Sequence, residues 1–268
     1  MESGRPSARE RTDTWTLPPE TTRLVVLGDP HGDLIGFEEV LAREERPGTA
    51  FVSVGDNVGY ADGVLSSHFC ALLAAKGVPS VAGNHEAWSE GGKLFLSPPG
   101  QPKELTAEAW AWLQALPHRL VVASGAAPDL RIHVVHTLPD WAYVNADNAE
   151  RFLDLEGADV VLCGHTHRPA LYTALRGKRL AVRQLDPRSA LPLEAKLEQG
   201  ARYVVDAGSL ARPSRPGRGT CEERGTYAVL DLVARSVRLH SVDKRPRIRA
   251  LMKQMLAQPP RRRRSPFE

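Results

Sequence analysis

Three shortages in this 268-residue sequence exclude whole classes of protein. No apolar run approaches the roughly eighteen residues that a membrane-spanning helix needs, so we expect no membrane association. Its three cysteines are scattered and odd in number, which argues against a disulfide scaffold and favours a cytoplasmic location. Aromatic residues make up only 6%, so aliphatic side chains must fill most of the core. The polar, proline-bearing start lacks the hydrophobic segment of a secretory signal.

Charge is unevenly distributed along the chain. Residues 244–268 hold nine basic residues and one acid, or +8, whereas residues 1–243 hold 26 and 31, or −5. The overall charge therefore gives no ground for inferring a nucleic-acid function. We expect a flexible leader over 1–22, one domain over 23–243 and a basic tail over 244–268. A solvated tail is expected, with contact to nucleic acid or to an acidic partner as the alternative.

Short β-branched runs that end in polar clusters alternate with segments of helical periodicity. This pattern predicts strands over 23–27, 50–54, 78–82, 131–135, 158–163 and 202–205. Helices are predicted over 33–45, 64–76 and 107–116, and a short one that is capped by Asn145 or Asp147 and ends at 155. Later segments predict an antiparallel pair (226–232 with 236–242), a hairpin (171–185) and a lip or short helix (186–200). Strands that alternate with helices indicate an α/β layered fold.

The polar clusters at the strand ends carry the candidate site. In open α/β sheets, ligands bind at the carboxyl ends of the strands. The side chains delivered there are Asp29, His31, Asp56, Asn84, His85, His136, His165 and His167. They offer oxygen and imidazole ligands and no thiolate, which suits one or two divalent transition metals such as Mn²⁺, Fe²⁺ or Zn²⁺. Turn residues that merely cap helices are the alternative, but turns do not need so many ligands.

A second histidine on the same predicted strand is an alternative to His136 as the site residue. His133 lies three residues earlier and faces the opposite way by strand alternation. We favour His136 because it stands at the end of the strand, where functional side chains collect.

The order and the residue types of these clusters resemble the motifs of a known family. Gly28-Asp-Pro-His-Gly32, Gly55-Asp-Asn57, Gly83-Asn-His-Glu86, His136 and Gly164-His-Thr-His167 are similar to the calcineurin-like metallophosphoesterase signature. The five motifs occur in the family's order, and the resemblance extends from about 24 to 232. It implies a two-sheet αββα sandwich with outer helices and a dinuclear metal site at one edge.

The resemblance also implies a role for each residue. Asp29, His31 and His167 would bind one metal ion, Asn84, His136 and His165 the other, and Asp56 would bridge both. A hydroxide held between the ions would attack phosphorus, with His85 as the general acid that protonates the leaving oxygen. Glu86 would orient His85 or a neighbouring element. Mn²⁺ is the expected metal, with Fe, Zn or Ni as alternatives.

Two departures indicate a branch of the family. Asn57 follows Asp56 at the position where protein phosphatases carry an arginine that binds phosphate. Asparagine at this position is similar to the small bacterial and archaeal phosphodiesterases. Asp206-Ala-Gly-Ser-Leu210 resembles that branch's late Asn-Pro-Gly-Ser segment, with Asp-Ala in place of Asn-Pro. Arg212 follows it and is a candidate for holding substrate phosphate, with an ordinary loop arginine as the equal alternative.

The expected activity is therefore metal-dependent phosphodiester hydrolysis. The alternatives are a phosphomonoesterase that acts on a nucleotide or phosphoprotein and a non-catalytic metal-binding scaffold. The expected partner is a phosphoester substrate, with a nucleotide or nucleic acid as candidates. The sequence leaves the substrate, the metal used in the cell and the oligomeric state open.

Overall fold

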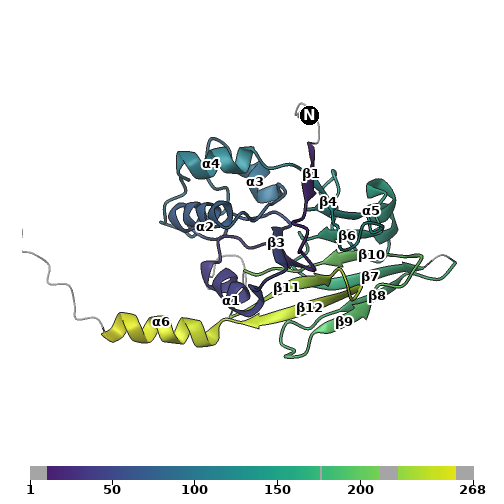
Figure 1. Ribbon diagram of the computed structural model, residues 1–268. Coiled ribbons are helices and arrows are strands. Elements are labelled where there is room, and N and C mark those ends of the chain that lie inside the picture. The colour runs from purple at the N-terminus through teal and green to yellow at the C-terminus, as the bar shows by residue number, and fades with distance from the viewer. Residues whose placement is uncertain (1–10, 176, 212–222, 258–268) are drawn as a thin grey trace, which may run out of the picture.

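Two β-sheets packed face to face, with helices on their outer faces, form the body of the protein (Figure 1). The computed structural model describes residues 11–175, 177–211 and 223–257. This is the α/β sandwich that the sequence predicts.

The larger sheet has seven strands in the order β1-β4-β5-β6-β10-β7-β8. They are β1 (Thr12–Thr16), β4 (Arg119–Ala123), β5 (Ile132–Val135), β6 (Val160–Cys163), β7 (Ala170–Leu175), β8 (Ala181–Gln184) and β10 (Ala201–Asp206). The smaller sheet has five strands in the order β3-β2-β11-β12-β9. They are β2 (Arg23–Leu27), β3 (Thr49–Ser53), β9 (Leu193–Lys196), β11 (Arg224–Asp231) and β12 (Ser236–Asp243).

Parallel pairing in both sheets decides where the site can form. In the smaller sheet β2 runs parallel to β3, and in the larger sheet β6 runs parallel to both β5 and β10. Parallel neighbours end at the same edge of a sheet, so the turns that follow these five strands are brought together.

The main core lies between the two sheets, and strand alternation divides each strand between two apolar layers. In β2, Leu24 and Val26 face the other sheet, whereas Val25 and Leu27 face the helices. In β6, Leu162 faces inward and Val161 outward. A strand buried on both faces needs the nearly continuous apolar run that the sequence has at these positions.

Six helices occur in the described residues: α1 (Leu34–Glu44), α2 (Gly63–Ala75), α3 (Asn84–Trp88), α4 (Ala107–Gln114), α5 (Ala149–Glu156) and α6 (Arg245–Ala257). Side chains of α1 and α2 pack on the smaller sheet, and α5 packs on the larger one (Figure 1). Asp33 caps α1 by accepting a hydrogen bond from Gly36 N at 2.9 Å. Asp62 caps α2 in the same way at Leu65 N. These caps fix where the chain leaves the turns after β2 and β3.

Several sequence expectations need correction. Thr12–Thr16, expected within a flexible leader, forms β1 and pairs in parallel with β4. The run 78–82 is not a strand and makes only an isolated bridge from Ser80 to Ser53, since Pro79 lacks an N–H to donate. Asn148, rather than Asn145 or Asp147, precedes α5 at the N-cap position. The hairpin over 171–185 forms as β7 and β8, but 186–200 contains the strand β9 rather than a helix.

The described part of the basic segment, residues 244–257, is folded. Lys244 is fully buried, and its Nζ donates to Asp33 Oδ2 at 2.5 Å and to the Leu210 carbonyl at 3.0 Å. The next residues form α6, which extends away from both sheets (Figure 1). Arg247 on α6 pairs with Glu38 on α1 at 2.9 Å. The expected solvated tail thus begins inside the fold.

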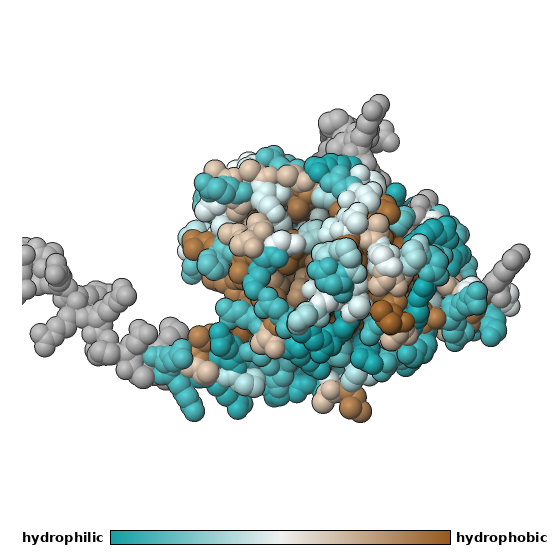
Figure 2. Space-filling model, viewed as in Figure 1, coloured by the Kyte–Doolittle hydropathy of each residue, from teal (hydrophilic) through white to brown (hydrophobic). Residues whose placement is uncertain are grey.

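The surface is predominantly polar in the view of Figure 2, where apolar residues appear as separate small patches. Every helix in the described part of the chain is too short or too polar to cross a membrane.

Candidate metal centre

Turns that follow strands of both sheets bring the predicted site residues together. Asp29 and His31 follow β2, Asp56 follows β3, Asn84 and His85 begin α3, His136 follows β5, and His165 and His167 follow β6. All are buried except His165 and His167, which are half-buried.

Five of these residues have left-handed backbone, which is unfavourable for a residue with a Cβ atom. The φ angles are 27° at Asp29, 47° at His31, 52° at Asp56, 74° at His165 and 56° at His167. Each such residue costs about 1–3 kcal/mol and persists only where its surroundings hold it. Strain concentrated in this way is typical of functional sites.

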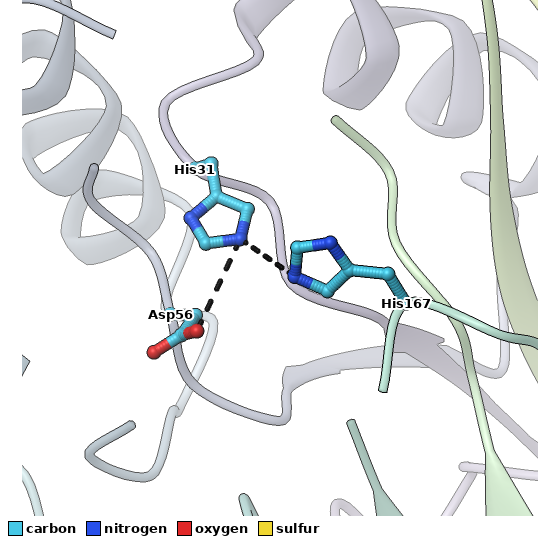
Figure 3. Close-up of side chains that lie close together, drawn as sticks. All are labelled: His31, Asp56 and His167. Carbon is cyan, nitrogen blue, oxygen red and sulfur yellow. Dashed lines mark hydrogen bonds and ion pairs between the residues drawn. The ribbon is translucent and has the colours of Figure 1, made fainter. Parts of the chain in front are cut away.

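The first cluster contains His31, Asp56 and His167 (Figure 3). Nε2 of His31 lies 3.1 Å from Nε2 of His167 and 4.0 Å from Oδ2 of Asp56. Burial holds the pKa of His31 well below its usual value, so the ring is neutral. Its Nδ1 donates to the Val58 carbonyl at 3.0 Å, which leaves the Nε2 lone pair facing the cluster.

The second cluster contains Asp56, His136 and His165. Burial lowers the pKa of His136 to about 4, and its Nδ1 donates to the Val54 carbonyl at 2.9 Å. The Nε2 lone pair of His136 therefore faces the Asn84 Oδ1 at 2.9 Å. Nε2 of His165 donates to the Trp141 carbonyl at 3.2 Å, which leaves the lone pair on Nδ1.

Asp56 belongs to both clusters. Its Oδ1 accepts a hydrogen bond from His85 N at 2.9 Å, whereas its Oδ2 lies 3.5 Å from Nε2 of His136 and 4.0 Å from that of His31. Burial raises the pKa of Asp56 to about 8 in the protein alone. A carboxylate placed between two sets of nitrogen lone pairs is suited to be shared by two cations.

Asp29 has a buried oxygen that no hydrogen bond satisfies. Its Oδ2 accepts from His165 N at 2.8 Å and lies 3.4 Å from Nε2 of His167. Its Oδ1 is buried without a hydrogen-bond partner in the described part of the chain. Burial, followed by the negative charges of Asp56 and Asp206, raises the pKa of Asp29 well above its usual value.

These observations show that the residues fit divalent cations. Lone pairs of His136 and Asn84 face each other, two imidazole nitrogens meet at 3.1 Å, and a buried carboxylate oxygen is unsatisfied. A cation would relieve all three arrangements. Carboxylate and imidazole donors without thiolate suit Mn²⁺, Fe²⁺ or Zn²⁺.

His85 lies beside the two clusters and is held by packing. Its Nε2 is 3.9 Å from Oδ2 of Asp56. The backbone of Gly59 lies against the ring, so that a Cβ there would come within 2.0 Å of Nδ1 of His85. Burial, with smaller contributions from three site histidines, lowers the pKa of His85 to about 3. The ring is therefore neutral at neutral pH in the protein alone.

Glu86 supports the turn that carries Asp56 rather than the His85 ring. Its carboxylate accepts hydrogen bonds from the backbone N–H groups of Gly83 (2.7 Å), Asn57 (2.7 Å) and Asp56 (3.0 Å). Of the two roles expected for Glu86, the structure shows the second, orientation of a neighbouring element.

Asp206 is a site neighbour that the sequence analysis named only within the segment 206–210 and gave no role in the site. It ends β10, is fully buried, and accepts hydrogen bonds from Thr166 Oγ at 2.5 Å and Gly208 N at 2.9 Å. Thr166 stands between His165 and His167, so Asp206 holds the turn that presents both. Burial raises the pKa of Asp206 to about 7. Its position at a strand end was the signal that could have identified it.

Two further candidates from the sequence analysis remain. Arg212, the candidate phosphate ligand, falls outside the described residues. His133 belongs to neither cluster, whereas His136 belongs to the second.

Comparison with known proteins gives one family match. The family model for calcineurin-like phosphoesterases matches residues 22–169, more than half of the chain. No curated protein sequence matches this chain with significance.

Among the solved structures that match, one shares the fold. A metallophosphoesterase from Sphaerobacter thermophilus is 23% identical and superposes with a TM-score of 0.63, covering 90% of this chain and 96% of that chain. A conserved protein from Streptococcus pneumoniae, predicted to be a phosphoesterase, is 20% identical with a TM-score of 0.40, covering 84% of this chain and 90% of that chain.

Proposed function

This chain belongs to the calcineurin-like phosphoesterase family and is a metallophosphoesterase, a hydrolase of phosphoester bonds; on that premise we propose that it hydrolyses phosphodiesters with two divalent ions. The observation that carries the proposal is the sharing of Asp56 between two three-residue clusters. We also propose a cytoplasmic setting, which the two buried free cysteines, Cys70 and Cys163, suit.

We assign the ligands from the two clusters and, for Asp29 and Asn84, from the family resemblance. Asp29, His31 and His167 would hold one ion, Asn84, His136 and His165 the other, and Asp56 would contact both. Divalent ions bound there supply Lewis-acid polarisation of the phosphoryl oxygens and an activated water nucleophile. We propose Mn²⁺ because the donors are imidazole and carboxylate, with Fe²⁺, Zn²⁺ or Ni²⁺ as alternatives.

His85 is proposed to protonate the leaving oxygen. Its Nε2 lies near the shared carboxylate, and the Gly59 backbone fixes the ring. Burial lowers its pKa to about 3 in the protein alone, and the negative charge of a bound phosphoester would raise that pKa.

The residue after Asp56 favours a diester over a monoester. Asn57 is fully buried, its Oδ1 accepts from Ser53 Oγ at 2.7 Å, and its Nδ2 donates to Ser80 Oγ at 2.9 Å. This neutral, fully engaged side chain adds no positive charge to the phosphate position. A diester carries one negative charge and a monoester close to two at neutral pH, so the diester is the better match. Nucleic acid, whose backbone consists of phosphodiesters, is among the candidate substrates.

The test compares two chromogenic esters with metal-stripped protein, with and without Mn²⁺. We expect Mn²⁺-dependent cleavage of bis-p-nitrophenyl phosphate to exceed that of p-nitrophenyl phosphate. The variant His85→Ala should lower kcat by roughly 10²–10⁴-fold. His68→Ala, an exposed histidine on α2, is the matched control and should retain the rate.

Three outcomes contradict parts of the proposal. Preference for the monoester would favour a nucleotide or phosphoprotein phosphatase. Turnover that is independent of Mn²⁺ would contradict the metal assignment. No turnover of either ester while two metal ions remain bound would favour a metal-binding scaffold.

A further inference from the structure

Exposed aromatic side chains gather around the metal centre of a protein that has few aromatics. The strongly exposed aromatic residues in the described part of the chain are Tyr60, Trp88, Phe95, Trp141 and Tyr143. Each is linked to a histidine of the site by ring contacts, directly or through Trp88. We call this set the aromatic rim. Exposing large apolar rings around one site, while aliphatic residues fill the core, calls for a functional reason.

One part of the rim lies beside the first cluster. The Tyr60 ring is 4.5 Å from the ring of His31 and 5.0 Å from that of His85. Trp88 is 5.3 Å from His85, and Phe95 is 5.7 Å from Trp88. Tyr60 and Trp88 thus each contact the ring of His85, the proposed proton donor, and Phe95 contacts Trp88.

The other part lies beside the second cluster. Tyr143 stacks on His165 with centroids 4.3 Å apart and ring planes 13° apart, and the Trp141 ring is 6.5 Å from that of His165. Trp141 has a left-handed backbone with φ of 57°, and its carbonyl accepts from His165 Nε2. The Tyr143 carbonyl accepts from Asn148 Nδ2 at 2.8 Å. These hydrogen bonds fix the backbone that carries the two rings.

The two parts lie close enough to act on one ligand. The Tyr60 ring lies 6.3 Å from that of His167, and Tyr143 stacks on His165, two residues earlier in the same turn.

We propose that the aromatic rim binds the planar bases of a phosphodiester that joins two nucleosides, with one base on each part. This inference rests on the proposed diesterase function, which places phosphorus at Asp56 between the two parts. A diester extends one organic group on each side of phosphorus. A planar base on each group could stack on an aromatic ring, and such stacking contributes about 1–3 kcal/mol per base.

The test uses two esters with the same leaving group. Thymidine 5′-p-nitrophenyl phosphate and methyl p-nitrophenyl phosphate differ in the group that stays on phosphorus, so a difference in KM reports contacts with the nucleoside. We expect the thymidine ester to have a KM about tenfold lower with the Mn²⁺-loaded protein. Equal KM values would overturn the inference.

Variants distinguish stacking from a structural role. For thymidylyl-(3′,5′)-thymidine, which has a base on each side, Trp88→Leu and Tyr143→Leu should each raise KM about tenfold, whereas Tyr143→Phe should keep the wild-type value. A leucine variant that changes kcat while KM stays constant would indicate a structural role and overturn the inference.

The inference can fail separately from the proposed function. Turnover of neither nitrophenyl ester would contradict the diesterase function. Equilibrium dialysis of thymidylyl-thymidine with the Mn²⁺-loaded protein would then test the rim alone. Binding that Trp88→Leu and Tyr143→Leu each weaken would support the rim, and no binding would overturn it.

Discussion

The carboxylate of Glu86 accepts a hydrogen bond from the backbone N–H of Asp56, the residue that both metal clusters share, at 3.0 Å. The same Oε2 accepts from Gly83 N at 2.7 Å, and Oε1 accepts from Asn57 N at 2.7 Å. One buried side chain therefore joins the turn after β3 to the start of α3. Hydrogen bonds of this kind set the orientation of metal ligands and commonly affect metal affinity 10–100-fold.

We predict that Glu86→Gln lowers both stability and Mn²⁺ affinity. The amide replaces one acceptor oxygen with a donor that faces backbone N–H groups, and an unsatisfied buried donor costs about 1–3 kcal/mol. Urea unfolding and Mn²⁺ titration measure the two effects. Glu108→Gln, at an exposed position on α4, is the matched control. Mn²⁺ affinity equal to wild type would show that Glu86 does not position Asp56.

Gly59 is predicted to control His85 without contributing a ligand. A Cβ at this position would lie 2.0 Å from Nδ1 of His85, and its φ of +94° is unfavourable for alanine. Gly59→Ala should therefore displace the imidazole and lower kcat nearly as far as His85→Ala does. Mn²⁺ affinity should change little, because the proposed ligands exclude His85. Gly125→Ala, where a Cβ meets nothing within 4 Å, is the control. Normal kcat in Gly59→Ala would contradict the role given to His85.

Much of the site could be predicted because its residues directly follow apolar strand runs. Asp29, Asp56 and His165 each come after a glycine at the end of such a run, and parallel pairing brings those ends together. The local sequence thus contained both the ligand types and the strand pattern that brings the ligands together. The fold class followed from the same alternation of strands and helices.

Features that depend on distant pairing could not be predicted locally. Thr12–Thr16 reads as a polar leader but forms a strand because it pairs with Arg119–Ala123, more than a hundred residues away. Lys244 reads as the start of a solvated tail but is buried because Asp33 supplies a countercharge from another element. The aromatic rim comes from the end of α3 and from separate loops, whose shapes no spacing rule gives.

Removal of the metal is predicted to destabilise the protein. The buried carboxylates of Asp29 and Asp56 repel each other in the protein alone, which contributes to the raised pKa of Asp29. Mn²⁺ at a hundredfold excess over its Kd should add about 2.7 kcal/mol to the free energy of unfolding. Thermal unfolding with Mn²⁺ and with a chelator measures this difference. Asp56→Asn should lose most of the response, and an equal response in that variant would contradict the bridging assignment.

The last prediction concerns stability in acid and a histidine outside the site. His240 stacks on Tyr227 with ring centroids 5.0 Å apart, and its Nδ1 lies 3.4 Å from Nη2 of Arg43. Burial, followed by the charge of Arg43, lowers the pKa of His240 from 6.5 to about 4, although nearby Glu44 acts in the opposite direction. The unfolded chain therefore binds this proton more readily than the folded protein between pH 6.5 and 4.

The unfolding free energy should thus fall as pH decreases through that window, with at most about 3 kcal/mol due to His240. His240→Phe keeps an aromatic ring against Tyr227 and removes the proton site. Its stability should decline less steeply than wild type between pH 6.5 and 4, measured by urea unfolding at fixed ionic strength. The site histidines and aspartates titrate in both proteins, so the difference between the two curves isolates His240. His68→Phe, at an exposed position on α2, should follow the wild-type slope. Parallel curves for His240→Phe and wild type would show that His240 makes no contribution to acid sensitivity.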